Sequence, residues 1–441
     1  MPPTLPFGSR LNTLMADRSS TLGIIGAGTM GAGIAQVAIT TGWNVELMDV
    51  DESIVRNAID GIVKRLDRLV EKKRITQEQR DDAAGRLLVA SSPDCLSRCE
   101  LVIEAVVEDL DIKSKVLENV MPALRDDCII ATNTSSLSIT KIGEAIGQAH
   151  RTVGMHFFNP APIMKLVEVI QGAETDPAVV DRVAEIAVSW GKKVARAADV
   201  PGFIVNHVAR PYYLEAFRIL EDGYASPDVI DGAMKSLGGF RMGPLELTDF
   251  IGQDVNTATT RSVWEQLDRP ALLTPSQLQE KLVGDGDLGR KTGRGVYNYS
   301  GDEPIVALQV DHRPVNVSDE LREAASGFVR AATNETGDEL EEYIFARILV
   351  ALITQAKLAN ERGVAEKSDI DTALKFGVNY PKGPFEWADQ IGPERIDALT
   401  NALSYSPSLP GRGLGGGYIF GTTIRNPSRL QDRQTNRFQI S

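Results

Sequence analysis

The stretch Thr21–Gly31 reads TLGIIGAGTMG, a short apolar run that leads directly into a glycine-rich turn. A helical pattern follows the turn and ends near Gly42, a position typical of a helix C-cap. A second apolar run, Val45–Met48, is closed by Asp49. Strand, G-x-G-x-x-G turn, helix, strand and acid in this order predict a dinucleotide-binding βαβ unit. A glycine-rich turn that serves packing alone is the alternative.

The glycines of the turn have different expected functions. Gly26 permits the tight turn, Gly28 lets the backbone approach a pyrophosphate, and Gly31 lets helix and strand pack closely. The helix that starts at Thr29 and Met30 can bind phosphate through its N-terminal N–H groups, without any basic side chain. We therefore expect cofactor contacts at all five of these residues.

Asp49 distinguishes between the two nicotinamide dinucleotides. It ends the strand that follows the glycine turn and its helix, where its carboxylate can bind both ribose hydroxyls. Its negative charge would repel the 2′-phosphate of NADP. The sequence therefore predicts NAD as the cofactor.

The composition is that of an ordinary globular protein, with 42% apolar and 24% charged residues in 441. A chain of this length predicts two or three domains. We expect no membrane span, because no apolar run reaches about 18 residues, and residues 1–18 contain no run that resembles a signal peptide. The net charge of −13 argues against nucleic acid as a partner.

Cysteine usage bears on compartment and metal binding. Cys95, Cys99 and Cys128 are the three cysteines, too few for a disulfide framework and consistent with a reducing cytoplasm. Cys95 and Cys99 have the spacing of a metal pair, but no second pair accompanies them. We expect a cytoplasmic protein without a bound metal.

Further apolar runs alternate with helical patterns along the first half of the chain. This alternation predicts a parallel, doubly wound sheet. The expected strands are Leu101–Val107, Cys128–Ala131, Val153–Phe157 and Lys165–Ile170, and the expected helical segments are Glu52–Leu88, Lys113–Leu124 and Pro177–Trp190.

After residue 201 the chain is almost entirely helical and contains a repeat. Val205–Gly252 aligns without a gap with Phe345–Gly392, and 14 of the 48 aligned positions are identical, which indicates duplication. The expected fold is an α/β Rossmann-type doubly wound sheet followed by an all-α region whose helical unit is duplicated. The expected divisions are an NAD-binding domain at 19–200, a first helical domain at 201–299, a polar connector at 300–340, a second helical repeat at 341–402 and a disordered tail at 403–441.

A nicotinamide-dependent alcohol dehydrogenase needs a base near the hydroxyl group. The four histidines are His150, His156, His207 and His312. His156 stands out because it ends a strand, in the run HFFNP, where the active sites of such sheets collect. A tight return would bring Glu168, in the run MKLVEVI, beside it to orient the imidazole. On spacing alone, a structural histidine is the alternative.

Six motifs occur in the order seen in the L-3-hydroxyacyl-CoA dehydrogenases. They are GAGTMGAGIAQV, IEAVVEDLDIK, NTSSL, HFFNPAPIMKLVEVI, DVPGFIVN and GRKTGRGVYNY. The chain resembles this family from residue 21 to about 300, and more weakly to about 400. The resemblance implies NAD-dependent oxidation of (S)-3-hydroxyacyl-CoA to 3-oxoacyl-CoA, in fatty-acid β-oxidation or related acyl-CoA metabolism.

The resemblance also implies roles for individual residues. The general base falls on His156 and its carboxylate partner on Glu168; the hydroxyl and amide that orient the substrate fall on Ser135 and Asn206. Further cofactor contacts are implied at Asp49, Glu108, Lys113, Ser135, Asn159 and Lys291, and coenzyme A contacts at Arg65 and Lys72. From the residues alone, Ser135 could be a helix cap, Asn206 could cap or bridge backbone, and the basic residues could form ordinary solvated surfaces.

The second helical copy lacks two residues of the first. In the alignment of the copies, Asn206 corresponds to Ala346 and His207 to Arg347. We therefore expect one active site per chain, with residues 341–400 serving as packing. Shorter members of the family dimerise through this domain, so we expect either a homodimer or a pseudo-dimer of the two copies within one chain.

Two other functions remain open on the sequence. A dehydrogenase of a free hydroxy acid would share the glycine turn and a histidine, although HFFNPAPIMKLVEVI fits the thioester enzymes better. A non-catalytic, crystallin-like NAD-binding protein would not need Ser135, His156, Glu168 and Asn206 together.

Overall fold

The computed structural model describes residues 20–311, 313 and 317–405. It contains two compact units. One is formed by the chain up to Ala209 together with Ala356–Glu386, and the other by Arg210–Gln355 together with the chain from Trp387 onward. Part of the second helical copy therefore belongs to the same unit as the N-terminal sheet.

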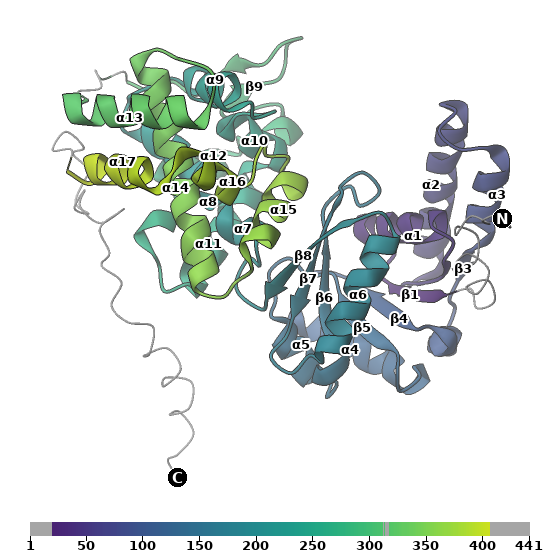
Figure 1. Cartoon of the computed structure of the whole chain (residues 1–441). Helices are drawn as coiled ribbons and strands as arrows, with labels where there is room; N and C mark the ends of the chain where they lie inside the picture. Colours follow the sequence, from purple (N-terminus) through teal and green to yellow (C-terminus); the bar gives the residue numbers. More distant parts are fainter. Residues whose placement is uncertain (1–19, 312, 314–316, 406–441) are drawn as a thin grey trace, which may run out of the picture. The chain divides into compact units, whose positions relative to one another are not determined.

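The first unit is built on an eight-stranded sheet in the order β3-β2-β1-β4-β5-β6-β7-β8 (Figure 1). All neighbouring strands are parallel except β6 and β7. The predicted fold class is confirmed, because the strands extend from β1 in both directions as in a doubly wound sheet. The strands are β1 Thr21–Ile25, β2 Asn44–Met48, β3 Leu87–Val89, β4 Leu101–Glu104, β5 Ile129–Thr132, β6 Thr152–Phe157, β7 Leu166–Gln171 and β8 Lys193–Ala198.

Helices cover both faces of this sheet. Successive residues of a strand point to opposite faces, so that Ile24 belongs to an apolar cluster with α1, α2 and α6, and Ile25 to a second cluster with α4 and α5. The helices of this unit are α1 Thr29–Thr40, α2 Glu52–Glu71, α3 Gln77–Gly85, α4 Leu110–Val120, α5 Ile139–Ala145, α6 Pro177–Ser189, α7 Val205–Val208 and α15 Lys367–Gly377.

The segment Glu52–Leu88, predicted as helical throughout, forms two helices and the start of a strand. The break between α2 and α3 contains Lys73 with a φ of 54°, a left-handed conformation that ends a helix. The end of the predicted segment was wrong, because Leu87 and Leu88 belong to β3 and pair with β2. An apolar Leu-Leu-Val run is compatible with either structure, and sheet pairing decides it.

The second unit is helical. Its helices are α8 Arg210–Glu221, α9 Pro227–Gly238, α10 Pro244–Ile251, α11 Gln253–Gln266, α12 Gln277–Asp285, α13 Asp319–Ala332 and α17 Pro393–Tyr405, while α14 Glu339–Glu361 and α16 Pro384–Ile391 extend across both units. A two-stranded ribbon joins β9 Tyr297–Asn298 to β10 Ile305–Val306. Helix α13 lies inside the predicted connector, and it buries Leu321, Phe328 and Val329 while its charged residues face solvent.

The duplication is confirmed in the helices. In the gapless alignment of the copies, the first residues of α9, α10 and α11 coincide with those of α15, α16 and α17. Gly223 and Gly363, which follow the first helix of each copy, have nearly equal φ angles of 73° and 71°. The two copies therefore share the starts of these three helices and the glycine turn after the first helix.

The two copies contact each other through a buried ion pair. Arg347 Nε of α14 donates to Glu215 Oε2 of α8 at 2.8 Å, and both side chains are almost fully buried. Arg347 also donates to the Tyr343 hydroxyl at 3.0 Å. This arginine occupies the position that holds His207 in the first copy, so the second copy uses the position for packing.

Within the described residues, no helix is both long and apolar enough to cross a membrane. Helix α17 reaches Tyr405, so the start of the predicted tail at 403–441 is helical. The rest of that tail, 406–441, lies outside the described residues.

Candidate active site

His156 and Glu168 face each other across the antiparallel strands β6 and β7. The strand register pairs these two residues directly, which places their side chains on the same face of the sheet. His156 Nδ1 lies 2.7 Å from Glu168 Oε2. His156 is 7% exposed and Glu168 is fully buried. The predicted placement of Glu168 beside His156 is confirmed, although residues 158–165 join the two strands in place of a tight return.

A sharp turn before α7 fixes the other oxygen of Glu168. Glu168 Oε1 accepts the backbone N–H groups of Ile204 at 3.1 Å and Val205 at 2.8 Å. The turn contains Gly202 with a φ of 78° and Phe203 with a φ of 47°. A left-handed conformation is costly for a bulky residue such as phenylalanine and recurs at functional sites. The carboxylate is therefore held by three donors before any substrate binds.

The histidine ring is oriented so that its second nitrogen remains available. With Glu168 as a carboxylate, Nδ1–H donates and Nε2 keeps its lone pair. Among the described residues, no contact to Nε2 is present. The rings of Phe158 and Phe203 pack on the imidazole, with centroids at 4.5 and 5.8 Å. The two aromatic rings therefore pack against the imidazole.

The glycine turn has the shape of a dinucleotide cradle. A Cβ on Gly26 would lie 2.6 Å from the Ala105 oxygen, and a Cβ on Gly31 would lie 1.8 Å from the Gly26 oxygen. These two glycines are required by the fold itself. A Cβ on Gly28 would meet no atom within 4 Å, so the space beside this residue is open, as the approach of a pyrophosphate to the backbone would require.

Two further features of the turn suit NAD. Helix α1 begins after Gly28 with no side-chain cap and with no acidic residue in its first turn, which leaves its positive end open to phosphate. Asp49 accepts the backbone N–H groups of Ala27 at 2.6 Å and Val50 at 2.7 Å. Each carboxylate oxygen can accept a further donor, so the fixed carboxylate fits a ribose diol.

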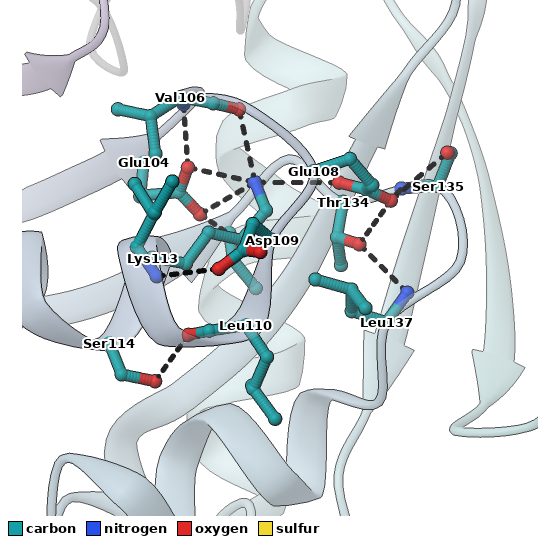
Figure 2. Close-up of polar contacts among 12 residues, drawn as sticks. Glu104, Val106, Glu108, Asp109, Leu110, Lys113, Ser114, Thr134, Ser135 and Leu137 are labelled. Atoms are coloured by element: carbon teal, nitrogen blue, oxygen red, sulfur yellow. Dashed lines mark hydrogen bonds and ion pairs between the residues drawn. The ribbon is translucent and has the colours of Figure 1, made fainter.

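Glu108 accepts several hydrogen bonds from the turn that follows β5 (Figure 2). Glu108 Oε1 accepts the Thr134 hydroxyl at 2.7 Å, and the backbone N–H groups of Ser135 and Ser136 at 2.8 and 3.0 Å. The hydroxyls of Ser136 and Ser135 lie within 2.9 and 3.1 Å of the same oxygen. Burial alone would raise the pKa of Glu108, but these hydrogen bonds and the charge of Lys113 lower it below its ordinary value.

The Ser135 hydroxyl makes the weakest hydrogen bond to Glu108 in this group. One carboxylate oxygen has about two lone-pair directions, yet five donors of Thr134, Ser135 and Ser136 surround Glu108 Oε1. The Ser135 hydroxyl makes the longest of these contacts, at 3.1 Å, and Ser135 is exposed. Its proton is therefore free to turn toward a ligand oxygen.

Lys113 lies next to Glu108 and is fully buried. Its ammonium donates to both oxygens of Glu104, at 2.8 and 3.1 Å, and lies 3.5 Å from Glu108 Oε2 (Figure 2). Glu104, also fully buried, accepts the Thr132 hydroxyl and the Val106 N–H at 2.6 Å each. The ammonium of Lys113 thus lies between two carboxylates and does not face solvent.

Comparison with known proteins assigns the chain to a family. Residues 21–200 match the NAD binding domain of 3-hydroxyacyl-CoA dehydrogenase, and residues 202–299 and 343–411 match its C-terminal domain. The chain is 38% identical to the 3-hydroxyadipyl-CoA dehydrogenase of Escherichia coli K12, over 87% of this chain and 94% of that protein. The chain belongs to the 3-hydroxyacyl-CoA dehydrogenase family. It is an NAD-dependent oxidoreductase of this family.

Other members support the assignment. A 3-hydroxybutyryl-CoA dehydrogenase of Bradyrhizobium diazoefficiens is 40% identical over 291 residues, which take in 66% of this chain and 99% of that protein. The crystal structure of a 3-hydroxybutyryl-CoA dehydrogenase from Escherichia coli K12 superimposes with a TM-score of 0.78 at 37% identity, over 88% of this chain and 95% of that chain.

The remaining predicted site residues of this dehydrogenase lie on several elements. Asn206 is on α7 and half-buried, and Asn159 is exposed just after β6. On α2, Arg65 Nε donates to Gln36 at 2.6 Å, and Lys72 is exposed at the helix end. Lys291 belongs to the second unit, where its ammonium contacts Asp254 at 2.5 Å.

The other histidines of the dehydrogenase have different surroundings. His150 is exposed, and His207 is buried with Nδ1 3.1 Å from the Pro201 oxygen; His312 lies outside the described residues. Burial lowers the pKa of His207 to about 4. Within the described residues, no group of three or more metal-binding side chains is present, and all three cysteines are free.

Four residues of this site were not predicted from the sequence. They are Glu104, Thr134, Ser136 and Phe203. Glu104 lies in the quoted motif IEAVVEDLDIK, where a charged residue inside a buried strand is a usable signal. Phe203 lies in DVPGFIVN, where Pro-Gly indicates a turn but not the left-handed residue that follows.

Proposed function

We propose that this enzyme catalyses the reversible, NAD-dependent oxidation of (S)-3-hydroxyacyl-CoA to 3-oxoacyl-CoA, with His156 as the general base. The supporting observation is the 2.7 Å contact from His156 Nδ1 to a buried carboxylate. Backbone donors fix that carboxylate independently. A histidine that served packing alone would not require a buried carboxylate oriented toward its ring.

The proton transfer follows from this geometry. His156 Nε2 takes the proton of the substrate hydroxyl, and the imidazolium that forms is stabilised by Glu168 at its other nitrogen. NAD⁺, when bound, accepts the hydride that leaves C3, so that C3 is oxidised to a ketone. In the reverse direction, His156 returns the proton to the carbonyl oxygen.

Ser135 and Asn206 are proposed to orient the substrate oxygens. The Ser135 hydroxyl is suited to this because Glu108 binds the neighbouring N–H groups and hydroxyls and thereby holds the turn in place. Releasing the 3.1 Å contact of Ser135 costs the turn one of five donors. Asn206 follows Val205, whose N–H binds Glu168, so base and amide are tied to one turn.

NAD is proposed to bind along the glycine turn and the strand ends beside it. The contacts are Gly26, Gly28, Thr29, Met30, Gly31, Asp49, Glu108, Ser135, Asn159 and Lys291, while the fully buried Lys113 acts through Glu108. Arg65 and Lys72 are proposed to bind coenzyme A phosphates, because Arg65 lies on α2, Lys72 follows its last residue, and both are positively charged. The names of the relatives support butyryl and adipyl substrates as the first to test.

The decisive test is acetoacetyl-CoA reduction with NADH and with NADPH. The native enzyme is expected to prefer NADH. His156→Gln is expected to lower kcat by a factor of about 10²–10⁴. His150→Gln, a change at an exposed histidine, is the matched control and should leave kcat unchanged. Turnover of free hydroxy acids only would support the hydroxy-acid dehydrogenase, and NADH binding without any turnover would support the crystallin-like protein.

We further propose that the second helical copy makes a pseudo-dimer with the first, within a cytoplasmic chain that has one active site. The buried pair Arg347–Glu215 between the copies supports this, and the three free cysteines fit a reducing compartment. Deleting residues 341–441 should expose the Glu215 face of α8 and change folding or oligomeric state. An unchanged fold and oligomeric state would refute the pseudo-dimer.

A further inference from the structure

Residues of the second helical copy cover one edge of the sheet. β8 is the edge strand on that side, and an uncovered edge would expose unpaired backbone groups. Ala198 N donates to the Val364 oxygen at 2.8 Å, and Arg196 N donates to Asp369 Oδ1 at 3.2 Å. Helix α15 packs along β8, β7 and α7. All of these elements belong to the first unit.

The last residue of α15 is a glycine in a crowded position. A Cβ built on Gly377 would lie 2.7 Å from Leu166 Cδ2, 2.9 Å from Val205 Cγ2 and 3.7 Å from Phe158 Cζ. Carbon atoms in ordinary contact are about 3.5–4.0 Å apart. The helix therefore approaches these three residues as closely as the absence of a side chain allows.

Each of the three neighbours is linked to the acid–base pair. Leu166 is two positions before Glu168 on β7, and its side chain therefore shares a face with that carboxylate. Val205 donates its N–H to Glu168 at 2.8 Å. Phe158 packs its ring on His156 at a centroid distance of 4.5 Å.

The equivalent position of the first copy is not a glycine. Gly377 corresponds to Leu237 in the alignment of the two copies, and Leu237 is buried inside its own helical unit. A leucine at 377 would occupy the space of Leu166 and Val205. The small residue is therefore a feature of the copy that packs on the sheet.

We propose that Gly377 is a positioning residue for catalysis, through which α15 of the second copy braces the His156–Glu168 pair. This inference rests on the proposed function, because it takes His156 as the base. Leu166 can rotate its terminal methyl away from a new side chain, but Val205 is β-branched and stiff. An added methyl group therefore displaces Val205 by about half an ångström and lengthens its hydrogen bond to Glu168.

The experiment compares Gly377→Ala with Gly327→Ala. Gly327 is a helical glycine of α13 whose added Cβ would meet nothing within 4 Å, so its variant should keep full activity. For Gly377→Ala we expect kcat of acetoacetyl-CoA reduction to fall about tenfold, with NADH binding unchanged. The alkaline limb of the kcat/KM profile for reduction should move to lower pH, because reduction needs the imidazolium and a loosened carboxylate stabilises it less.

A second substitution tests whether the clash with Val205 is the cause. Val205→Ala removes the methyl group that the new Cβ meets but keeps the backbone N–H to Glu168. The double variant Gly377→Ala/Val205→Ala should therefore regain most of the lost kcat. Failure of this rescue in a folded protein would overturn the proposal, and so would an unchanged kcat and pH profile in Gly377→Ala alone.

Two controls separate the possible failures. If Gly377→Ala does not fold, Asp369→Ala is the substitute test, because it removes the side-chain acceptor of Arg196 N on β8. A fall in kcat of roughly two- to fivefold is expected. An unchanged kcat would overturn the proposed positioning role of α15. His156→Gln is assayed in parallel. Its full activity would overturn the assignment of the base, whereas an inactive His156→Gln with a normal Gly377→Ala would overturn the brace alone.

Discussion

Replacing Lys113 by methionine should destabilise the NAD-binding unit by about 3–4 kcal/mol at pH 7. Lys113 is fully buried, and its ammonium donates to both oxygens of the fully buried Glu104. Removing one member of a buried ion pair costs about 3–5 kcal/mol. The alternative for the orphaned carboxylate is to take up a proton. Holding a proton on an ordinary glutamate, of reference pKa about 4.3, costs about 3.7 kcal/mol at pH 7, which limits the loss.

The sign of the pH dependence follows from the same reasoning. A carboxyl group that must be neutral in the folded state costs no stability at low pH. It destabilises the fold as the pH rises above the pKa that the group has in the unfolded chain. The deficit of Lys113→Met should therefore shrink to about 1 kcal/mol at pH 5. The double variant Glu104→Gln/Lys113→Met, which has neither charge, should recover most of the loss at pH 7.

Hydrogen exchange measured by mass spectrometry is the appropriate assay. It reports opening free energies for individual segments, whereas the two units need not unfold as one two-state system. Peptides from β4 and β5 should show the deficit, and peptides from α8 to α12 provide an internal control. A deficit below about 1 kcal/mol at pH 7, or one that stays constant down to pH 5, would refute the reasoning.

Three further predictions follow from single positions. Gly28→Ala should fold normally but raise the Kd for NADH about tenfold or more, whereas Gly31→Ala, whose Cβ would lie 1.8 Å from a backbone oxygen, should fail to fold; circular dichroism and NADH titration distinguish them. Burial lowers the pKa of His207 to about 4, so below about pH 6.5 the unfolded chain binds a proton that the folded chain does not, and the fold becomes less stable. The free energy of unfolding of wild type should therefore fall by about 2 kcal/mol more than that of His207→Gln between pH 7 and pH 5. Equal losses in urea unfolding would contradict this. Arg347→Met should cost about 3 kcal/mol in exchange experiments on α8 and α14, and Glu215→Gln/Arg347→Met should recover part of it.

The features that sequence predicted are encoded within short stretches of chain. The glycine turn and Asp49 lie within one βαβ unit, and the return that brings Glu168 to His156 spans 12 residues. Such contacts leave a local pattern of strand, turn and charge that can be interpreted directly. The doubly wound fold followed from the same alternation of local patterns.

The features that sequence did not predict join distant residues or depend on competing structures. Gly377 meets Leu166, which lies in the first half of the chain, and no local periodicity marks such a contact. The bond from Thr134 to Glu108 spans 26 residues and uses a threonine that looks like an ordinary turn residue. Leu87 and Leu88 were predicted as helix, because only pairing with β2 makes them a strand.

The duplication itself separates the structural residues from the functional ones. Asp231 accepts the backbone N–H groups at the start of α10, and Asp371 does the same at the start of α16. Burial raises the pKa of Asp231 to about 7 and that of Asp371 to about 6. A Cβ on Gly243 or Gly383 would lie about 2.3 or 2.2 Å from the aspartate of its own copy. These identities are needed to cap a helix, and they carry no chemistry.

The positions at which the copies differ carry the functional information. Asn206, the residue after the turn that holds Glu168, corresponds to Ala346 in the second copy, so the second copy has no amide at this position. Leu237 has become Gly377, which lets α15 approach the strands beside the same carboxylate. Under the proposed function, the first difference leaves the second copy without a substrate contact, and the second lets α15 pack against the sheet. The second copy keeps the helical framework of the first, and on these proposals it supports the single active site instead of forming another.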